Sequence, residues 1–197
     1  SLTNLTLSEM VNDIEAADQT LLNIVGRRTD IFVVGTSCGG GVTVKWCNTF
    51  NRKIRKIFLM APVLDYEYEV TGRVRNIGLP GQPSALSSED ISSLRENGYL
   101  NPEIKYGRAM VNGAHIFDAN KELNMLDSKV VVFQGTSDSV VPISITKSLI
   151  KKTRNTVLVE IKDADHGFAV KGDDNLTDPG TKKNHYFVYQ EILKRLR

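Results

Sequence analysis

Hydrophobic and polar positions follow two repeating patterns along the chain. Short apolar runs occur at 30–35, 54–62, 129–135 and 156–161, and such runs are typical of buried strands in a parallel sheet. Segments with helical spacing predict helices over 8–25, 38–50, 142–153 and 182–197. Strand and helix alternate in most of the chain. This predicts an α/β fold, with a mostly parallel sheet and helices on both faces.

Local signals support the ends of these helices. Ser8 is a plausible N-cap for the first helix, and Gly26 stands where its C-terminal cap is expected. Pro142 fits the first turn of the helix over 142–153. The first strand, at 30–35, is expected to be buried on both faces because its run is almost entirely apolar.

The segment 64–126 departs from the alternation. It contains Pro80, Pro83 and Pro102 and several polar clusters, and it predicts helices and no strong strand. One helix is expected from Ser87 or Ser88 to about Asn97, and a second over 103–119. We therefore expect a core formed by 1–63 and 127–197, with 64–126 inserted as a helical cap.

Composition narrows the class of protein. Hydrophobic residues make up 41% of the 197 positions and charged residues 24%, as in an ordinary globular domain. The net charge of +2 gives no reason to expect nucleic acid or an anionic membrane as a partner. No apolar run approaches the roughly 20 residues of a membrane span. The first ten residues lack the pattern of a signal peptide.

Cysteine and histidine usage adds two expectations. Cys38 and Cys47 lie nine residues apart in one predicted helix, too far for a disulfide, so both are expected to be reduced thiols in a cytoplasmic protein. A zinc site is not expected, because the three histidines are scattered along the chain.

A short motif at the end of the first strand carries the candidate chemistry. Gly35-Thr36-Ser37-Cys38-Gly39 matches G-x-S-x-G between a predicted strand and a predicted helix. Such a turn exposes the serine, its glycines permit close backbone approach, and the backbone N–H of Cys38 would face an oxyanion. On the pentapeptide alone, a glycine-rich turn with a spectator serine is an equal alternative.

Two further loops supply partners for a serine nucleophile, which needs a base and an acid to orient that base. Asp138 follows the strand at 129–135, and His166 follows the strand at 156–161. All three residues come just after strand ends, where open α/β sheets place their sites. Three other acids stay open as alternatives to Asp138, namely Asp163, Asp165 and, more weakly, Asp65.

With these motifs, the chain resembles the α/β-hydrolase superfamily of serine hydrolases, and within it the carboxylesterases, acylglycerol lipases and cinnamoyl esterases. "GTSCGG" is similar to the nucleophile turn, "GTSDSVVP" to the acid loop and "DADHGF" to the histidine loop. The resemblance implies that Ser37 attacks an ester, that His166 is the base and that Asp138 orients it. It implies a small-molecule ester substrate and no cofactor or metal.

The resemblance is incomplete at the N-terminal side. In this family several strands precede the nucleophile turn, and one of their loops supplies a second N–H to the oxyanion. Here residues 1–29 predict one helix and no strand, and the chain does not begin with Met. Three explanations stay open: a fragment of a longer protein, strands supplied by another chain, or a natural truncation with little activity. We expect the sheet edge to be covered, for example by a dimer partner.

Rival functions use the same residues differently. A thioesterase or peptidase would share the three catalytic residues, and a catalytically silent binding module would fit the shortened N-terminal part. An epoxide hydrolase or dehalogenase is excluded because these chemistries use a carboxylate where this chain has Ser37. Simpler interpretations apply to Trp46 as core and to His115 and His185 as surface or packing residues. A weaker expectation is an acyl pocket lined from the cap by Tyr66, Tyr68, Leu79, Leu86 and Ile91.

Overall fold

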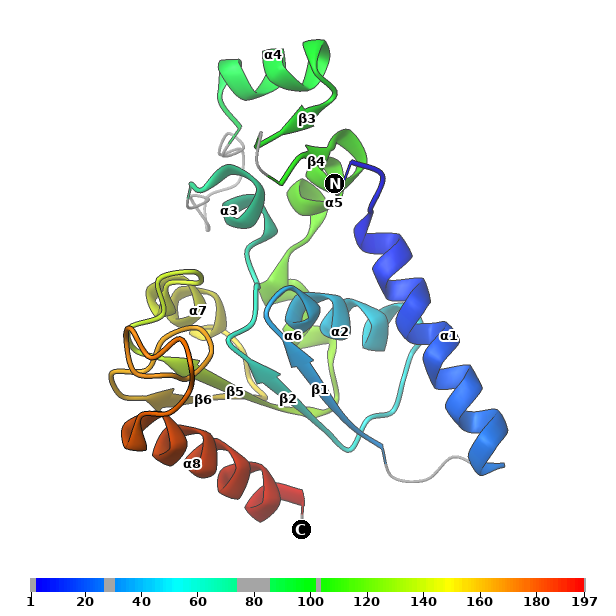
Figure 1. Ribbon diagram of the computed structural model, residues 1–197. Helices are drawn as coiled ribbons and strands as arrows, with labels where there is room; N and C mark the ends of the chain where they lie inside the picture. Colours follow the sequence, from blue (N-terminus) through cyan, green and yellow to red (C-terminus); the bar gives the residue numbers. More distant parts are fainter. Residues whose placement is uncertain (1–2, 27–30, 74–85, 102–103, 197) are drawn as a thin grey trace.

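A computed structural model describes residues 3–26, 31–73, 86–101 and 104–196. Its main sheet contains four strands, β1 (Phe32–Thr36), β2 (Lys56–Met60), β5 (Lys129–Gly135) and β6 (Thr156–Ile161). The strands lie in the order β1-β2-β5-β6, and each neighbouring pair is parallel (Figure 1). All four therefore end at the same edge of the sheet, which confirms the predicted mostly parallel α/β architecture.

Alternate side chains of the central strands point to opposite faces of this sheet. Ile57 and Leu59 join the larger hydrophobic cluster, whereas Phe58 between them joins a second cluster on the other face. The larger cluster includes residues of α1 (Leu7–Val25), α2 (Cys38–Thr49), α6 (Ala119–Met125) and α7 (Ile143–Ile150). The second includes Val188 of α8 (Pro179–Leu196). Helices thus cover both faces.

β1 is the outermost described strand on its side of the sheet. The prediction that this segment is buried on both faces is wrong, because Val34 is 51% exposed and Phe32 and Val33 are only partly buried. An apolar run indicates a strand, but it does not distinguish an edge strand from a central one. That a second chain covers this edge stays a prediction.

Helix ends agree with the predictions to within a few residues. Thr6, rather than Ser8, is the N-cap of α1, and it forms a capping box with Glu9. Gly26 ends this helix in the left-handed conformation, as expected. Pro142 is the N-cap of α7 and not part of its first turn. The last helix begins at Pro179, earlier than expected.

The segment 64–126 contains α3 (Tyr66–Thr71), α4 (Ser88–Glu96), β3 (Tyr99–Leu100), β4 (Tyr106–Gly107), α5 (Arg108–Ile116) and α6. Ser87 caps α4, as predicted. The helix expected over 103–119 is shorter, because Tyr106 and Gly107 pair with β3 before α5 begins. In Figure 1, α3, α4 and α5 stand beyond the sheet, whereas α6 contacts α2 and α7. The division into core and cap stays a prediction.

None of the helices in the described ranges is both long and apolar enough to cross a membrane.

Candidate functional site

Ser37 occupies the turn between β1 and α2, at the carboxyl end of the sheet. Its backbone has φ 48° and ψ −126°, which is uncommon for a residue with a Cβ atom. The chain around it holds this conformation: the N–H of Ser37 donates to the carbonyl of Met60 at 2.9 Å, and its own carbonyl accepts from Gly40 and Val63 at 2.9 and 2.8 Å. The turn is thus tied to the end of β2, which fixes where the hydroxyl points.

Glycines permit the close approach of three segments at this turn. A Cβ atom added at Gly35 would lie 2.6 Å from Thr43 Oγ1, and one added at Gly40 would lie 2.4 Å from Pro62 Cβ. At Gly41 it would lie 2.6 Å from the ring of Tyr66. The same atom at Gly39 would meet nothing within 4 Å. The close approach expected beside Ser37 therefore requires glycine at positions 35, 40 and 41. Gly39 faces open space.

This difference gives a matched pair of variants for stability. Gly40→Ala would force a methyl group into the rigid Pro62 ring, so we expect it to lower the free energy of unfolding by about 1–3 kcal/mol. Gly39→Ala, one residue away in the same helix, introduces no clash and is the control. Chemical denaturation of both variants measures the difference. Equal stability of the two would contradict the packing described here.

His166 connects Ser37 to Asp138 through its two ring nitrogens. Nε2 lies 2.9 Å from Ser37 Oγ, and Nδ1 lies 3.0 and 3.2 Å from the two carboxylate oxygens of Asp138. Ser37 follows β1, Asp138 lies in the loop after β5, and His166 lies in the loop after β6. Because parallel strands end at one edge, residues that are 129 and 28 positions apart in sequence meet there.

The Asp138 carboxylate is fixed by its own loop. The residue is only 6% exposed, and its Oδ1 accepts from the backbone N–H groups of Val140 and Val141 at 3.0 and 2.8 Å. Gln134 Nε2 stands 3.5 Å from Oδ2. The carboxylate is therefore oriented before any ligand binds, and its Oδ2 is left to face the His166 ring.

The alternative acids have other tasks in the structure. Asp165 Oδ1 accepts from the backbone N–H groups of Gly167 and Ala169, both at 2.9 Å, and so shapes the turn that carries His166. Asp65 caps α3 by accepting from Tyr68 N. Asp163 is exposed, and its backbone N–H donates to Thr136. None of these three has a hydrogen bond to His166 in the described part of the chain.

Charge and hydrogen bonding tune the imidazole. The hydrogen bond from Asp138 raises the pKa of His166 above its usual value, and partial burial opposes this increase. The negative charges of Asp138, Asp165 and Glu69 raise the pKa of His166 further. The protonated imidazole is thus stabilised, as required of a base that must accept a proton from a hydroxyl group.

The backbone N–H of Cys38 lies in the first turn of α2, where amide groups lack helical acceptors and favour negative charge. Its role as an oxyanion donor stays a prediction. The Cys38 thiol is partly buried, and burial, followed by the charge of Glu69, raises its pKa. A raised pKa leaves little thiolate, so the backbone of this residue is better suited to chemistry than its sulfur.

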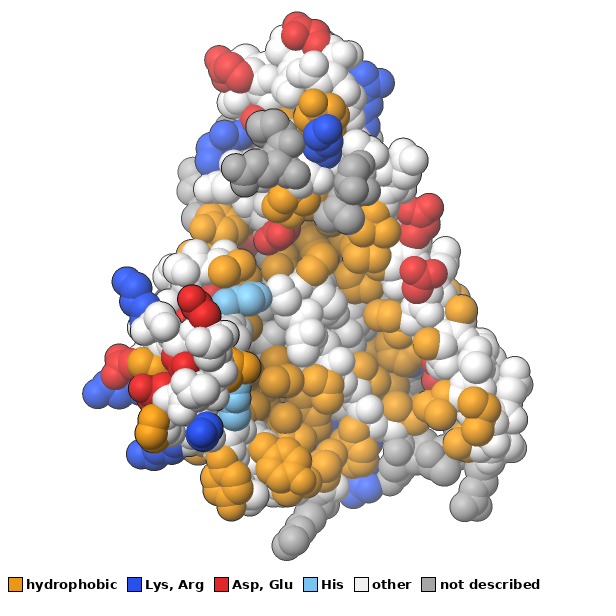
Figure 2. All heavy atoms as spheres, in the orientation of Figure 1, with side chains coloured by type: hydrophobic (Ala, Val, Ile, Leu, Met, Phe, Trp, Pro, Cys, Tyr) orange, Lys and Arg blue, Asp and Glu red, His pale blue; other side chains and the backbone are white. Residues whose placement is uncertain are grey.

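The segment 64–126 contributes a carboxylate that sequence reasoning missed. Glu69 of α3 is half-buried and accepts a hydrogen bond from Tyr106 OH at 2.8 Å, and its charge acts on both Cys38 and His166. Figure 2 shows a largely hydrophobic surface between the α3–α5 region and the sheet. In the sequence, Glu69 looks like any acidic residue near a helix start.

The residues expected to line an acyl pocket have mixed positions. Tyr66 is fully buried, its ring packs edge-on against Phe117, and its hydroxyl donates to the carbonyl of Cys38. Tyr68 and Leu86 are partly buried, and Ile91 is 42% exposed. Leu79 lies outside the described residues. Tyr66 therefore supports the turn that carries Ser37 rather than offering a free surface to a ligand.

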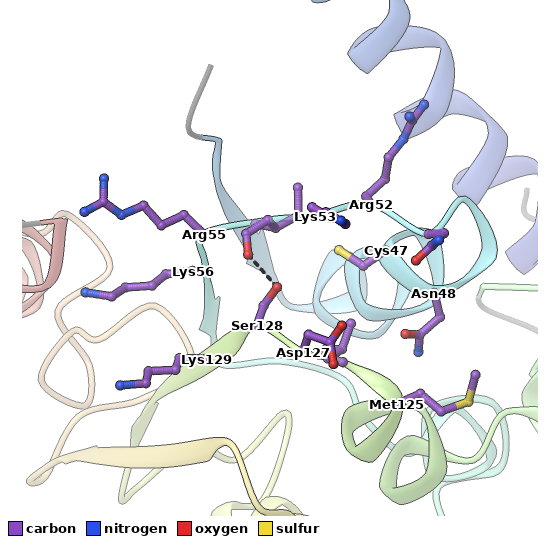
Figure 3. Close-up of a pocket in the computed structure, with 13 residues that line it drawn as sticks. Cys47, Asn48, Arg52, Lys53, Arg55, Lys56, Met125, Asp127, Ser128 and Lys129 are labelled. Atoms are coloured by element: carbon purple, nitrogen blue, oxygen red, sulfur yellow. Dashed lines mark hydrogen bonds between the residues drawn. The ribbon is translucent and has the colours of Figure 1, made fainter. Parts of the chain in front are cut away.

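A hollow of about 610 Å³ lies at the opposite end of the strands (Figure 3). Its walls carry five basic residues, Arg52, Lys53, Arg55, Lys56 and Lys129, and one acid, Asp127. Lys56 donates to the backbone carbonyl of Arg195 in the last turn of α8, where a cation is favoured by the helix dipole. Arg52 pairs with Glu15 and Asp18 of α1. Lys56 and Arg52 thus have structural tasks, and the hollow lies at the end of the strands away from Ser37.

Comparisons with known proteins give matches at the level of structure. No protein-family model matches the sequence, and no curated protein matches it. Est1E from Butyrivibrio proteoclasticus is similar in structure, with a TM-score of 0.62 at 20% identity over 95% of this chain and 72% of that one. A monoacylglycerol lipase from Paleococcus ferrophilus gives 0.52 at 20% identity, over 94% and 74%. Mouse alpha/beta hydrolase domain-containing protein 10 gives 0.63 at 13% identity, over 100% and 73%.

The chain therefore has the α/β-hydrolase fold, as the three motifs in its sequence predicted. Identities of 13–20% carry the fold and not the reaction. What the site does must be argued from its own residues.

Proposed function

We propose that this chain is a serine hydrolase that cleaves carboxylic esters through Ser37, His166 and Asp138. The observation that carries the proposal is the continuous hydrogen-bonded path from Ser37 Oγ through both nitrogens of His166 to the buried Asp138 carboxylate. A nucleophile, a base and a group that orients the base are what acyl transfer requires. A spectator serine in a glycine-rich turn would need neither partner.

The reaction then has two halves. His166 Nε2 takes the proton of Ser37 as Oγ attacks the ester carbonyl, and Asp138 keeps the other ring proton on Nδ1. The carbonyl oxygen becomes an oxyanion near the Cys38 N–H, which donates to it. His166 returns the proton to the alcohol as it leaves, and an acyl group remains on Ser37. A water molecule, deprotonated by His166, releases the acid and restores the serine.

Labelling with a fluorophosphonate tests this proposal without knowledge of the substrate, because the probe reacts with an activated serine. We expect one adduct per chain, which peptide mapping assigns to Ser37. A panel of p-nitrophenyl esters, thioesters and amides would then separate esterase from thioesterase and peptidase activity. Folded protein that takes up no probe would support the alternative of a silent binding module.

We further propose that the acyl part of the substrate carries a hydroxyl group that donates a hydrogen bond to the Glu69 carboxylate. The Glu69 carboxylate is within electrostatic reach of His166, stands at the cap side of the site and is held by Tyr106. A half-buried carboxylate favours a neutral ligand with a hydroxyl group over an anionic one. Est1E has been solved with ferulic acid bound, and ferulic acid is an aromatic acid with such a hydroxyl.

Glu69→Gln is expected to reduce discrimination between methyl 4-hydroxycinnamate and methyl cinnamate. A hydrogen bond to a charged group contributes about 1.5–3 kcal/mol, so the ratio of their kcat/KM values should fall by about tenfold to a hundredfold. Using a ratio cancels any effect of the lost charge on His166. Glu96→Gln, at an exposed position on α4, is the matched control. An unchanged ratio in Glu69→Gln would exclude this contact.

A further inference from the structure

The loop that carries His166 is attached to α8 by three side chains. Thr181 Oγ1 accepts from the backbone N–H of Val170 at 2.9 Å, and the other two side chains are adjacent in the helix. His185 Nε2 donates to the carbonyl of Gly167 at 2.8 Å, and Asn184 Nδ2 donates to the carbonyl of Phe168 at 3.1 Å. These carbonyls belong to the two residues that directly follow His166. Both donors come from the first half of α8, which packs under the loop (Figure 1).

The loop itself is strained and needs such support. Asp163 and Phe168, on either side of His166, have φ values of 57° and 62°, which residues other than glycine rarely adopt. On the side of the sheet the loop is fixed by hydrogen bonds, because Ser137 N–H donates to the carbonyl of Ala164 at 2.9 Å and Asp163 N–H donates to Thr136 Oγ1 at 2.8 Å. After His166, the described hydrogen bonds from other elements to Gly167 and Phe168 are the two from α8.

We propose that His185 and Asn184 are positioning residues, which hold the loop so that the His166 ring spans Ser37 and Asp138. This inference rests on the proposed function for its effect on rate. The ring contacts Ser37 at 2.9 Å and Asp138 at 3.0 Å, so a shift of the loop would disturb both contacts. His185 acts through the backbone and has no described contact with Ser37 or Asp138.

The role of His185 does not depend on its own charge. Its Nε2 can donate in the protonated ring and in one neutral tautomer, and Gly167 offers only an acceptor. The charged groups that act on His166 are Asp138, Asp165 and Glu69. Loss of the α8 contacts would weaken the hydrogen bond between His166 and Asp138. This hydrogen bond is the main cause of the raised His166 pKa. The expected change is thus a lower His166 pKa together with a slower reaction.

His185→Ala, Asn184→Ala and His185→Gln test this role, with Lys183→Ala as the matched control on the exposed side of the same turn. We expect the fluorophosphonate labelling rate of His185→Ala, measured at its own optimal pH, to fall by about tenfold to a hundredfold. His185→Gln keeps a donor at the same position and should restore most of the rate. Rates are compared per folded molecule, with folding checked by thermal denaturation.

Titration of the His166 ring by NMR gives a second readout that needs no activity. The midpoint should move to lower pH in His185→Ala and stay at the wild-type value in Lys183→Ala. If wild-type protein takes up no probe but this midpoint moves, the proposed function fails and the positioning role stands. A wild-type midpoint in both His185→Ala and Asn184→Ala would overturn the positioning role, as would a loss of rate explained by unfolding alone.

Discussion

Replacing Ser37 by alanine is expected to lower kcat for ester hydrolysis by about 10⁶, as removal of the nucleophilic serine does in a serine protease. The substitution removes Oγ, which is the atom that His166 contacts at 2.9 Å and the atom that would carry the acyl group. Alanine tolerates the backbone angles of this turn as well as serine does, so the fold should persist. Steady-state hydrolysis of an activated ester and loss of the probe adduct measure the effect.

A double variant distinguishes catalysis from accidental damage. If Ser37 and His166 act as one unit, Ser37→Ala combined with His166→Ala should be no slower than either single variant. Independent effects would multiply instead. Retention of more than a small fraction of the wild-type rate in Ser37→Ala, in protein free of contaminating esterase, would remove Ser37 from the reaction.

The positions of Ser37, Asp138 and His166 could be predicted because each lies within a few residues of the end of a strand. In a parallel sheet the strand ends determine where such residues meet, and short apolar runs identify strands well. The strand ends alone indicate that the three side chains meet, without any distance between them. The structure adds that the acid in contact with His166 is Asp138, whereas Asp165 binds backbone N–H groups of its own turn. Which acid faces the ring is a matter of loop conformation, which the sequence pattern does not specify.

Other features depend on contacts between distant segments and were missed. Val34 is exposed because β1 is the outermost described strand on its side of the sheet. An apolar run has the same pattern in an edge strand and in a central strand. Glu69 is set apart by its hydrogen bond with Tyr106 and by the effect of its charge on His166. His185 is set apart by its hydrogen bond to a carbonyl 18 residues earlier in the chain. A single polar residue on a helix has no sequence signal that separates these roles from simple solvation.

Asp138→Asn is expected to lower kcat by about 10⁴, the size of the effect when the orienting acid of a serine protease is changed in this way. The reason lies in the hydrogen bonds of this carboxylate. Oδ1 accepts from the N–H groups of Val140 and Val141, so the amide oxygen of Asn must take that position. The amide NH₂ then replaces Oδ2 and donates toward His166 Nδ1. The ring proton is displaced to Nε2, which can no longer accept from Ser37.

The same variant changes the pH dependence in a defined direction. His166 must be neutral to act as a base, so wild-type activity falls as the pH drops through its raised pKa, above the usual value of about 6.5. Without the carboxylate the pKa of His166 falls, and the acid limb of the kcat profile should move to lower pH while the plateau drops. Asp163→Asn is the control, because Asp163 is exposed and was an alternative acid in the sequence. If Asp163→Asn lost most of its kcat while Asp138→Asn kept a near-normal kcat, the choice of Asp138 as the acid that orients His166 would be wrong.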